Sequence, residues 1–341
     1  MTQDKTARKR VNLALQGGGA HGAFTWGVLD AFLSDGRLEI DGISGTSAGA
    51  MNAAIMTCGL SSGSADRARD KLAAFWKAVS VDGELAAPQR ALFDLFLSAW
   101  QVPGTANNWL NLTSLIPAPT AFNPLDINPL RDVVERHIDF PTLRGFDAVK
   151  LFVAATNVHT GKVRVFRRDE LTADMLMASA ALPTLFRAVE VEGEPYWDGG
   201  YMGNPVLFPL FTETETADII LIQINPIRRD EVPTSARDIA ERVNEITFNA
   251  SLLHELRAID FVRRLIDQGR LSDTHYKRIR LHRVEADKAL AGFGASSKLQ
   301  ADWDFFQELH RRGKEAGRRF LTNHFGMIGV EGTLDLREQL A

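Results

Sequence analysis

The sequence predicts an α/β protein built on a mainly parallel sheet, with helices on both faces. Short apolar runs that are typical of buried strands alternate along the 341 residues with longer segments of helical periodicity. Glycine-rich turns at 17–19 and 45–49 follow two of these runs directly and lead into helices. Strands that end in a turn and a helix are the units from which parallel sheets are built.

The first 80 residues contain two such units and a third helix. "VNLALQ" is a continuous apolar run typical of a buried strand, and Phe24, Val28 and Phe32 recur at helical spacing after it. The expected elements of this part are strands at 11–16 and 40–45 and helices at 20–34, 47–58 and 67–79.

Residues 88–127 have a different composition. A very apolar helix is predicted at 91–101, followed by an irregular stretch rich in proline and asparagine. Long irregular segments in a compact domain are often lids or binding loops. The segment is therefore expected to cover a binding site, and the alternative is a core helix followed by a surface loop.

The second half returns to alternating strands and helices. "KLFVAATN" and "KVRVF" predict adjacent strands joined by a turn, and "AVEVEGEPYWDGG" predicts a hairpin. The other expected elements are a strand at 217–225, a helix at 235–268, a strand at 276–284 and a helix at 298–323 capped by Ser296 or Ser297.

The composition is that of a globular protein and argues against several classes. The chain is 45% hydrophobic and 24% charged, with a formal net charge of -4, whereas nucleic-acid-binding proteins usually carry a basic excess. Its one cysteine, Cys58, allows no internal disulfide and suits a reducing compartment. The N-terminal apolar run is too short for a signal peptide, and no stretch has the about 20 apolar residues of a spanning helix. We therefore expect a soluble, cytoplasmic protein that binds no nucleic acid.

The glycines at 17–19 allow two interpretations. Gly17, Gly19 and Gly22 satisfy G-x-G-x-x-G, the dinucleotide-binding fingerprint. That fingerprint also needs an acid at the carboxyl end of the next strand, but Glu39 and Asp41 lie before the strand. In the other interpretation, the N–H groups of the loop stabilise an anion that exists only during a reaction.

A nucleophile motif stands where the acid is missing. The run 45–49, "GTSAG", matches G-x-S-x-G at a predicted strand-to-helix junction. Its glycines let the chain turn sharply, so that Ser47 Oγ projects from the sheet edge beside a helix N-terminus. The alternative is a serine that only caps the helix. It is weakened by the second glycine turn upstream, because nucleophile and oxyanion hole together need two such turns.

A third motif offers a base. Asp198, Gly199 and Gly200 in "YWDGGYMGNP" follow a predicted strand far from Ser47 in the sequence. By itself D-G is a common β-turn, but a serine nucleophile needs a base, and Asp198 is the best candidate. A carboxylate with an ordinary pKa of about 4 is a weak base. We therefore expect the oxyanion hole and the Ser47 helix N-terminus to supply much of the stabilisation.

The motifs GGGAHG, GTSAG and DGG, in this order and spacing, resemble those of the patatin-like phospholipase family, over residues 11–209. "SAALPTLF" is similar to the small-residue and proline segment that precedes the DGG strand in that family. The resemblance implies a three-layer α/β/α fold and the hydrolysis of lipid or related acyl esters, as by a phospholipase A or a lysophospholipase. A lipid substrate and peripheral contact with a membrane follow from it, and no cofactor is implied.

The resemblance also implies the roles of the site residues. Ser47 attacks, Asp198 acts as the base, and the loop N–H groups form the oxyanion hole. The oxyanion residues are Gly17, Gly18 and Gly19, and the supporting residues are Gly45, Ala48, Gly49, Gly199 and Gly200. The family often has Arg or Lys where this chain has His21. The alternatives are a dinucleotide-binding protein and a catalytically silent member that binds lipid.

Histidines and basic residues are expected to be structural. The histidines that follow Asp198 and could complete a Ser–His–Asp triad are His254, His275, His282 and His310, but none lies in an obvious loop after a strand. No histidine, cysteine or aspartate cluster has metal-ligand spacing, so we expect no metal. The basic residues between 311 and 319 predict either a solvated helix face or a patch for anionic headgroups.

We expect a single domain. Residues 1–10 form a flexible tail, and 11–210 form the catalytic core, with 88–127 as a lid or acyl-binding insertion. Residues 211–330 are the mostly helical remainder of the same domain, and 331–341 form a second tail.

Overall fold

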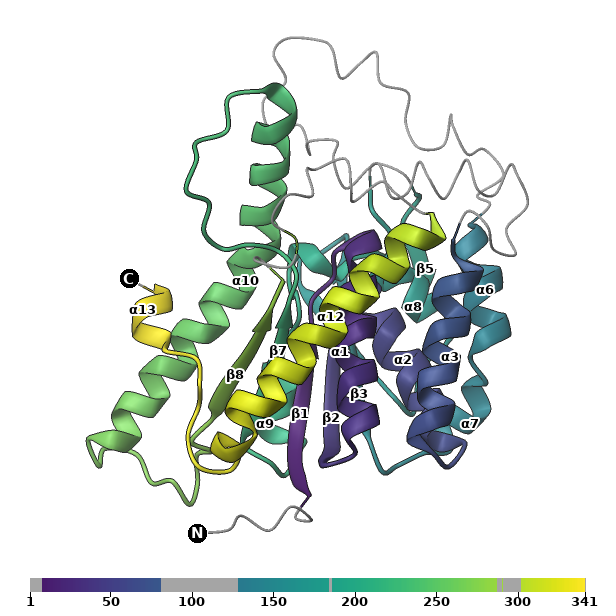
Figure 1. Cartoon of the computed structure of the whole chain (residues 1–341). Helices are drawn as coiled ribbons and strands as arrows, with labels where there is room; N and C mark the ends of the chain where they lie inside the picture. Colours follow the sequence, from purple (N-terminus) through teal and green to yellow (C-terminus); the bar gives the residue numbers. More distant parts are fainter. Residues whose placement is uncertain (1–7, 81–127, 184–185, 287–289, 291–301, 341) are drawn as a thin grey trace.

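The computed structural model describes residues 8–80, 128–183, 186–286, 290 and 302–340 (Figure 1). The predicted lid at 88–127 lies outside these residues. Among the helices within them, none is both long enough and apolar enough to cross a membrane.

Within the described residues, eight strands form one sheet in the order β5-β6-β3-β2-β1-β7-β8, with β4 beside β3. The strands are β1 (Lys9–Leu15), β2 (Leu38–Thr46), β3 (Lys150–Asn157), β4 (Val163–Arg167), β5 (Val189–Val191), β6 (Glu194–Asp198), β7 (Asp218–Gln223) and β8 (Arg280–Glu285). The pairs β1–β2, β1–β7, β2–β3 and β7–β8 are parallel, whereas β4, β5 and β6 pair antiparallel. The mainly parallel sheet predicted from the sequence is confirmed.

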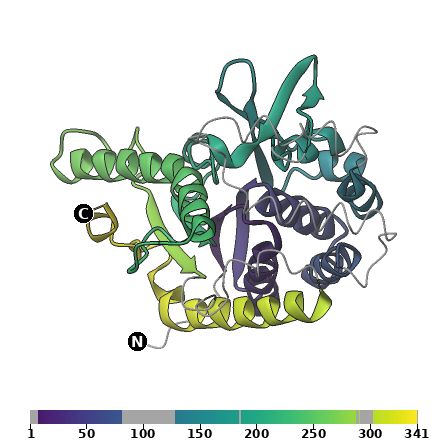
Figure 2. The same cartoon turned by 90° about the horizontal axis from the view of Figure 1, so that it is seen from above.

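Helices cover both faces of the sheet (Figure 2). The described helices are α1 (Gly22–Asp35), α2 (Ala48–Ser61), α3 (Ala65–Ala78), α6 (Pro129–His137), α7 (Phe140–Gly145), α8 (Ala173–Ser179), α9 (Phe208–Thr212), α10 (Ala236–Asp267), α12 (Trp303–His324) and α13 (Leu336–Leu340), with short 3-10 turns at Gly19–His21, Gly199–Tyr201 and Phe325–Met327. Side chains of α1, α2, α3 and α12 pack into one core, and those of α9, α10 and α13 pack into a second. Strand β1 supplies both, because Leu13 faces the first core and Ala14 the second. The three-layer α/β/α fold is confirmed.

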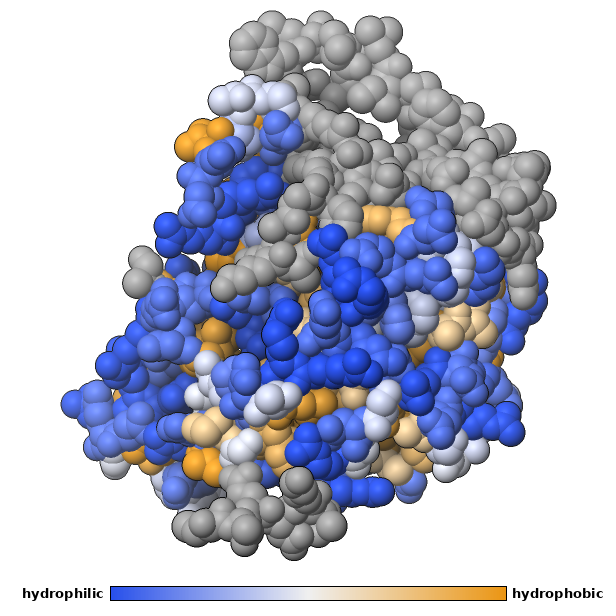
Figure 3. Space-filling view, in the orientation of Figure 1, coloured by the Kyte–Doolittle hydropathy of each residue, from blue (hydrophilic) through white to orange (hydrophobic). Residues whose placement is uncertain are grey.

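Helices α1 and α12 touch through their main chains. A Cβ on Gly27 would lie 2.0 Å from the carbonyl oxygen of His310, and one on Gly313 would lie 2.0 Å from that of Phe24. Only glycine allows such an approach at these positions. The outer side of α12 is mainly hydrophilic (Figure 3), and its inner side packs on the first core, so α12 separates this core from solvent.

Helix α12 begins later than predicted. Its first residue is Trp303, not 298, and its N-cap is Asp302, whose carboxylate accepts a hydrogen bond from the Phe305 N–H at 2.8 Å. The predicted caps Ser296 and Ser297 lie outside the described residues.

Both predicted tails are shorter than expected. Strand β1 starts at Lys9, inside the N-terminal tail, and Lys9 Nζ donates to the carbonyl of Ile328 at 2.6 Å. At the other end, Leu334 N–H donates to Leu281 O at 3.0 Å, and Leu336 is buried. Residues 331–340 are therefore packed on β8 and α10, because their leucines complete the second core.

Candidate active site

Ser47 occupies the sharp turn between β2 and α2. Its φ of 54° is a backbone angle that residues other than glycine rarely adopt, and the residue is almost wholly buried. The flanking glycines make the turn possible. A Cβ on Gly45 would lie 2.6 Å from Gly49 O, and one on Gly49 would lie 2.2 Å from Leu15 O. The predicted strand–turn–helix context of the nucleophile motif is present.

Strand β3 brings Asp198 close to Ser47. Thr46, the last residue of β2, pairs with Ala154 of β3, and Asp198, the last residue of β6, pairs with the adjacent Ala155. A Cβ on Gly199 would lie 2.2 Å from Ala154 O and 3.0 Å from the Thr46 methyl group, so the DGG turn packs directly on the end of β2.

The carboxylate of Asp198 is fully buried and only partly satisfied. Its Oδ1 accepts the Gly200 N–H at 2.7 Å, whereas its Oδ2 makes no hydrogen bond with the described residues. Burial raises the pKa of Asp198 to about 7, although the Gly200 N–H and the nearby Ser47 hydroxyl lower it. The ordinary pKa expected from the sequence is therefore wrong, because the packing removes water from the carboxylate.

The Ser47 hydroxyl is also unsatisfied. It lies near enough to Asp198 to lower the pKa of that residue, yet within the described part of the chain Ser47 Oγ makes no hydrogen bond of ordinary geometry. Catalytic hydrogen bonds are often long in unliganded enzymes and shorten when substrate binds.

The segment that ends α8 holds both residues by their main chains. Ser179 Oγ accepts the Ser47 N–H at 2.9 Å, and Ala181 O accepts the Asp198 N–H at 2.8 Å. These two bonds fix the separation of the nucleophile turn and the DGG turn. The sequence alone does not predict this role for Ser179.

The glycine loop lies against the nucleophile. A Cβ on Gly17 would be 2.9 Å from Ser47 Cβ and 2.8 Å from Thr46 O. The Gly17 N–H, one of the three expected oxyanion donors, is instead donated to Asn204 Oδ1 at 2.7 Å, so that expectation is corrected. The N–H groups of Gly18 and Gly19 donate to no acceptor in the described part of the chain.

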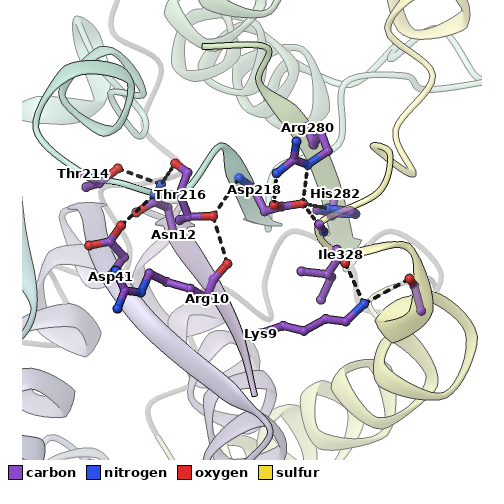
Figure 4. A network of polar contacts seen from close by, with 12 residues as sticks. Lys9, Arg10, Asn12, Asp41, Thr214, Thr216, Asp218, Arg280, His282 and Ile328 are labelled. Carbon is purple, nitrogen blue, oxygen red and sulfur yellow. Dashed lines mark hydrogen bonds and ion pairs between the residues drawn. The ribbon is translucent and has the colours of Figure 1, made fainter. Parts of the chain in front are cut away.

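The geometry disfavours the dinucleotide interpretation. Glu39 and Asp41 lie near the start of β2, at the edge opposite Ser47. The Asp41 carboxylate accepts the N–H groups of Glu215 and Thr216 at 2.6 and 2.9 Å, as part of a network that joins β1, β7 and β8 (Figure 4). No acid therefore stands at the carboxyl end of β2, where a ribose would need it.

The histidines lie in other surroundings. His282 is buried against Asp218 at 3.1 Å (Figure 4), and His310 lies 3.1 Å from Asp30 and packs at a tilt on Trp26. His254 and His275 are exposed. Among the described hydrogen bonds, none joins a histidine to Ser47 or Asp198.

The basic residues of α12 are mostly paired. Arg311 and Arg312 share Glu308, and Lys314 reaches Asp30. These contacts favour the solvated helix face over a patch for anionic headgroups.

An apolar pocket opens beside Ser47. Its walls include Met51, Phe75, Trp76 and Phe306, and its lining is almost wholly apolar. The Trp76 indole donates to Asn52 Oδ1 at 3.0 Å, which holds this wall in place. The pocket borders Val79 and Leu130, which flank the segment 81–127 in the sequence. The sequence alone does not predict Trp76 or Phe306 as site residues.

Comparison with known proteins bears on this site. The family model described as patatin-like phospholipase matches residues 13–211, more than half of the chain. VipD from Legionella pneumophila is similar over 94% of this chain and 68% of its own, with 16% identity and a TM-score of 0.45. ExoU from Pseudomonas aeruginosa, solved in complex with SpcU, is similar over 92% of this chain and 53% of its own, with 14% identity and a TM-score of 0.35. No curated protein matches the chain.

Proposed function

Since the chain belongs to the patatin-like phospholipase family, whose members are lipid acyl hydrolases, we propose that it hydrolyses acyl esters of phospholipid or lysophospholipid type with a Ser47–Asp198 dyad. The observation that carries the proposal is the proximity of two buried atoms, Ser47 Oγ and Asp198 Oδ2, that lack hydrogen bonds within the described residues. They lie beside a loop in which two N–H groups donate to no described acceptor. Buried polar atoms are usually hydrogen-bonded, so such a cluster is typical of a reaction site.

The reaction runs in two halves. Ser47 Oγ attacks the acyl carbonyl carbon and its proton passes to Asp198 Oδ2, while the carbonyl oxygen becomes an oxyanion between the N–H groups of Gly18 and Gly19. The bond to the leaving alcohol then breaks, and the alcohol takes the proton from Asp198. Water next attacks the acyl-serine and gives its proton to Asp198. The collapse then releases the fatty acid as Ser47 Oγ takes that proton back from Asp198, which restores both residues.

The pKa of Asp198 suits this role. A general base works best when its pKa lies near the working pH. At about 7, the Asp198 carboxylate is a far better base than an exposed aspartate and is still ionised in much of the protein at neutral pH. Nucleophile, base and oxyanion donors all come from the chain, so the proposed reaction needs no cofactor.

The apolar walls of the pocket support an acyl chain as the group that binds beside Ser47. A substrate with such a chain is presented at a lipid surface, so we propose that the protein meets it there by peripheral contact.

Labelling with a fluorophosphonate tests the proposal. The reagent phosphonylates only an activated serine, so the intact chain should be labelled at Ser47 and S47A should not. Ser44→Ala is a matched control, because Ser44 Oγ is also buried without a partner in the described structure but lies earlier on β2. Mass spectrometry of the labelled peptide gives the position. An unlabelled wild-type chain that still binds vesicles would favour the silent lipid-binding alternative.

Catalysis should need no histidine. Single alanine variants at His254, His275, His282 and His310 are each expected to keep substantial ester hydrolysis, because the proposed base is a carboxylate. Initial rates with a short acyl ester measure the effect, and circular dichroism shows whether each variant is folded. Loss of activity in a folded variant would indicate a Ser–His–Asp triad.

A further inference from the structure

The peptide that carries the Gly18 N–H is held at its other end by a side chain that follows β7. Gly17 O accepts a hydrogen bond from Asn225 Nδ2 at 2.8 Å, and Asn225 is 2% exposed. This C=O and the Gly18 N–H belong to one peptide unit. Because a trans peptide is planar, its N–H points opposite to its C=O. The direction of the Gly18 N–H is therefore set by Asn225.

Asn225 is itself held on both sides of its main chain. Its N–H donates to Gln16 Oε1 at 2.8 Å, and its carbonyl accepts from Gln223 Nε2 at 3.0 Å and from Asn249 Nδ2 at 3.4 Å. Gln16 Nε2 donates in turn to Asn249 Oδ1 at 2.8 Å. These amides are all buried, so the network ties the loop to β7 and to α10.

The neighbouring residue restrains the loop by contact. Ile224 lies directly behind Gly18, since a Cβ on Gly18 would be 3.0 Å from Ile224 Cγ2. The pair Ile224–Asn225 therefore fixes the loop by packing and by a hydrogen bond at once.

We propose that Asn225 is a positioning residue that aims the Gly18 N–H at the oxyanion, an inference that rests on the proposed function. Asn225 itself touches no reacting atom. Its hydrogen bond to Gly17 O also polarises the shared peptide and makes the Gly18 N–H a stronger donor. Preorganised donors of this kind stabilise developing charge because they need no reorientation during the reaction.

The test compares an acyl ester with its thionoester, in which sulfur replaces the carbonyl oxygen. Sulfur accepts hydrogen bonds weakly, so a thionoester gains little from the oxyanion hole. In N225A, kcat for the ester should fall by about tenfold, kcat for the thionoester should change little, and KM should stay within about twofold. The ester-to-thionoester ratio should thus fall by about tenfold. Asn225→Asp keeps the shape of the side chain but loses the Nδ2 donor, so it should change the ratio in the same direction. It replaces N225A in the test if N225A does not fold.

N12A is the matched control. Asn12 is a fully buried amide in the middle of β1, and it donates to Thr214 Oγ1, which precedes the start of β7, at 2.9 Å (Figure 4). It should lower the melting temperature without changing the ratio. An unchanged ratio in N225A or N225D, measured in an active enzyme, would overturn the role of Asn225 alone. A wild-type chain without Ser47-dependent ester hydrolysis would overturn the proposed function as well.

Discussion

Asp198→Asn is expected to abolish ester turnover as fully as Ser47→Ala and to make the folded protein more stable above pH 7. The asparagine keeps the shape of the side chain and can still accept the Gly200 N–H, but it cannot take a proton from Ser47. Initial rates measure the first effect, and urea unfolding measures the second. Turnover by a folded D198N near the wild-type rate would exclude Asp198 as the base.

The gain in stability follows from the raised pKa. The folded protein holds the Asp198 proton up to a pH of about 7, whereas the unfolded chain releases it near 3.8. Between these values the folded state binds more protons, so the free energy of unfolding falls as the pH rises. At about 1.4 kcal/mol per pKa unit, the full difference is about 4 kcal/mol. D198N should therefore unfold at higher urea than wild type at pH 8 and at nearly the same urea at pH 4.

The same pKa predicts the pH dependence of activity. Wild-type kcat should rise as the pH passes through about 7, because only the ionised carboxylate is a base. Glu255, which accepts the Leu207 N–H, has its pKa raised to about 7 by burial and could produce a similar profile. E255Q is the control and should keep the rise. A profile that becomes flat in E255Q would assign the titration to Glu255.

Gly18→Val should lower kcat by about 10²–10³-fold, the usual loss for one oxyanion donor. Its Cβ alone would lie 3.0 Å from Ile224 Cγ2, so the larger side chain must displace the loop and turn the Gly18 N–H away. Steady-state kinetics with a short acyl ester measure the effect.

Gly145→Val controls for the substitution itself, because nothing lies within 4 Å of the Cβ position at Gly145. It should keep nearly full activity. A folded G18V with more than half of the wild-type kcat would contradict the role of the loop, as would measurable binding of a dinucleotide to the wild-type loop.

Ser47 and Asp198 could be found in the sequence because glycines mark the positions where strands end in tight turns. Those glycines are required by close approaches within the turn, such as Gly45 against Gly49 O at 2.6 Å, and so leave a readable pattern. The alternation of apolar runs and helical segments predicted the layered fold for the same reason, since both patterns depend on neighbours along the chain.

The parts that could not be predicted depend on contacts distant in sequence. Asn204 takes the Gly17 N–H, and Asn225 holds the Gly17 carbonyl, from positions about two hundred residues away. Asn225 left one signal, since it is the polar residue that ends the apolar run at 217–225. The pKa of Asp198 could not be predicted either, because it depends on how completely the folded core excludes water.

Because these contacts come from later positions in the chain, the parts of the proposed active site are synthesised at different times. Ser47 and Asp198 are made before β7, Asn225 and α12. Until β7 is synthesised, β1 has one neighbouring strand instead of two. Until α12 is synthesised, α1 lacks the helix that packs on Gly27. Nascent chains begin to fold from their N-terminal end, and uncovered apolar surface invites aggregation. On our proposal, the nucleophile and its base emerge before the oxyanion donor is aimed, so hydrolytic competence is delayed until β7 and Asn225 have been made.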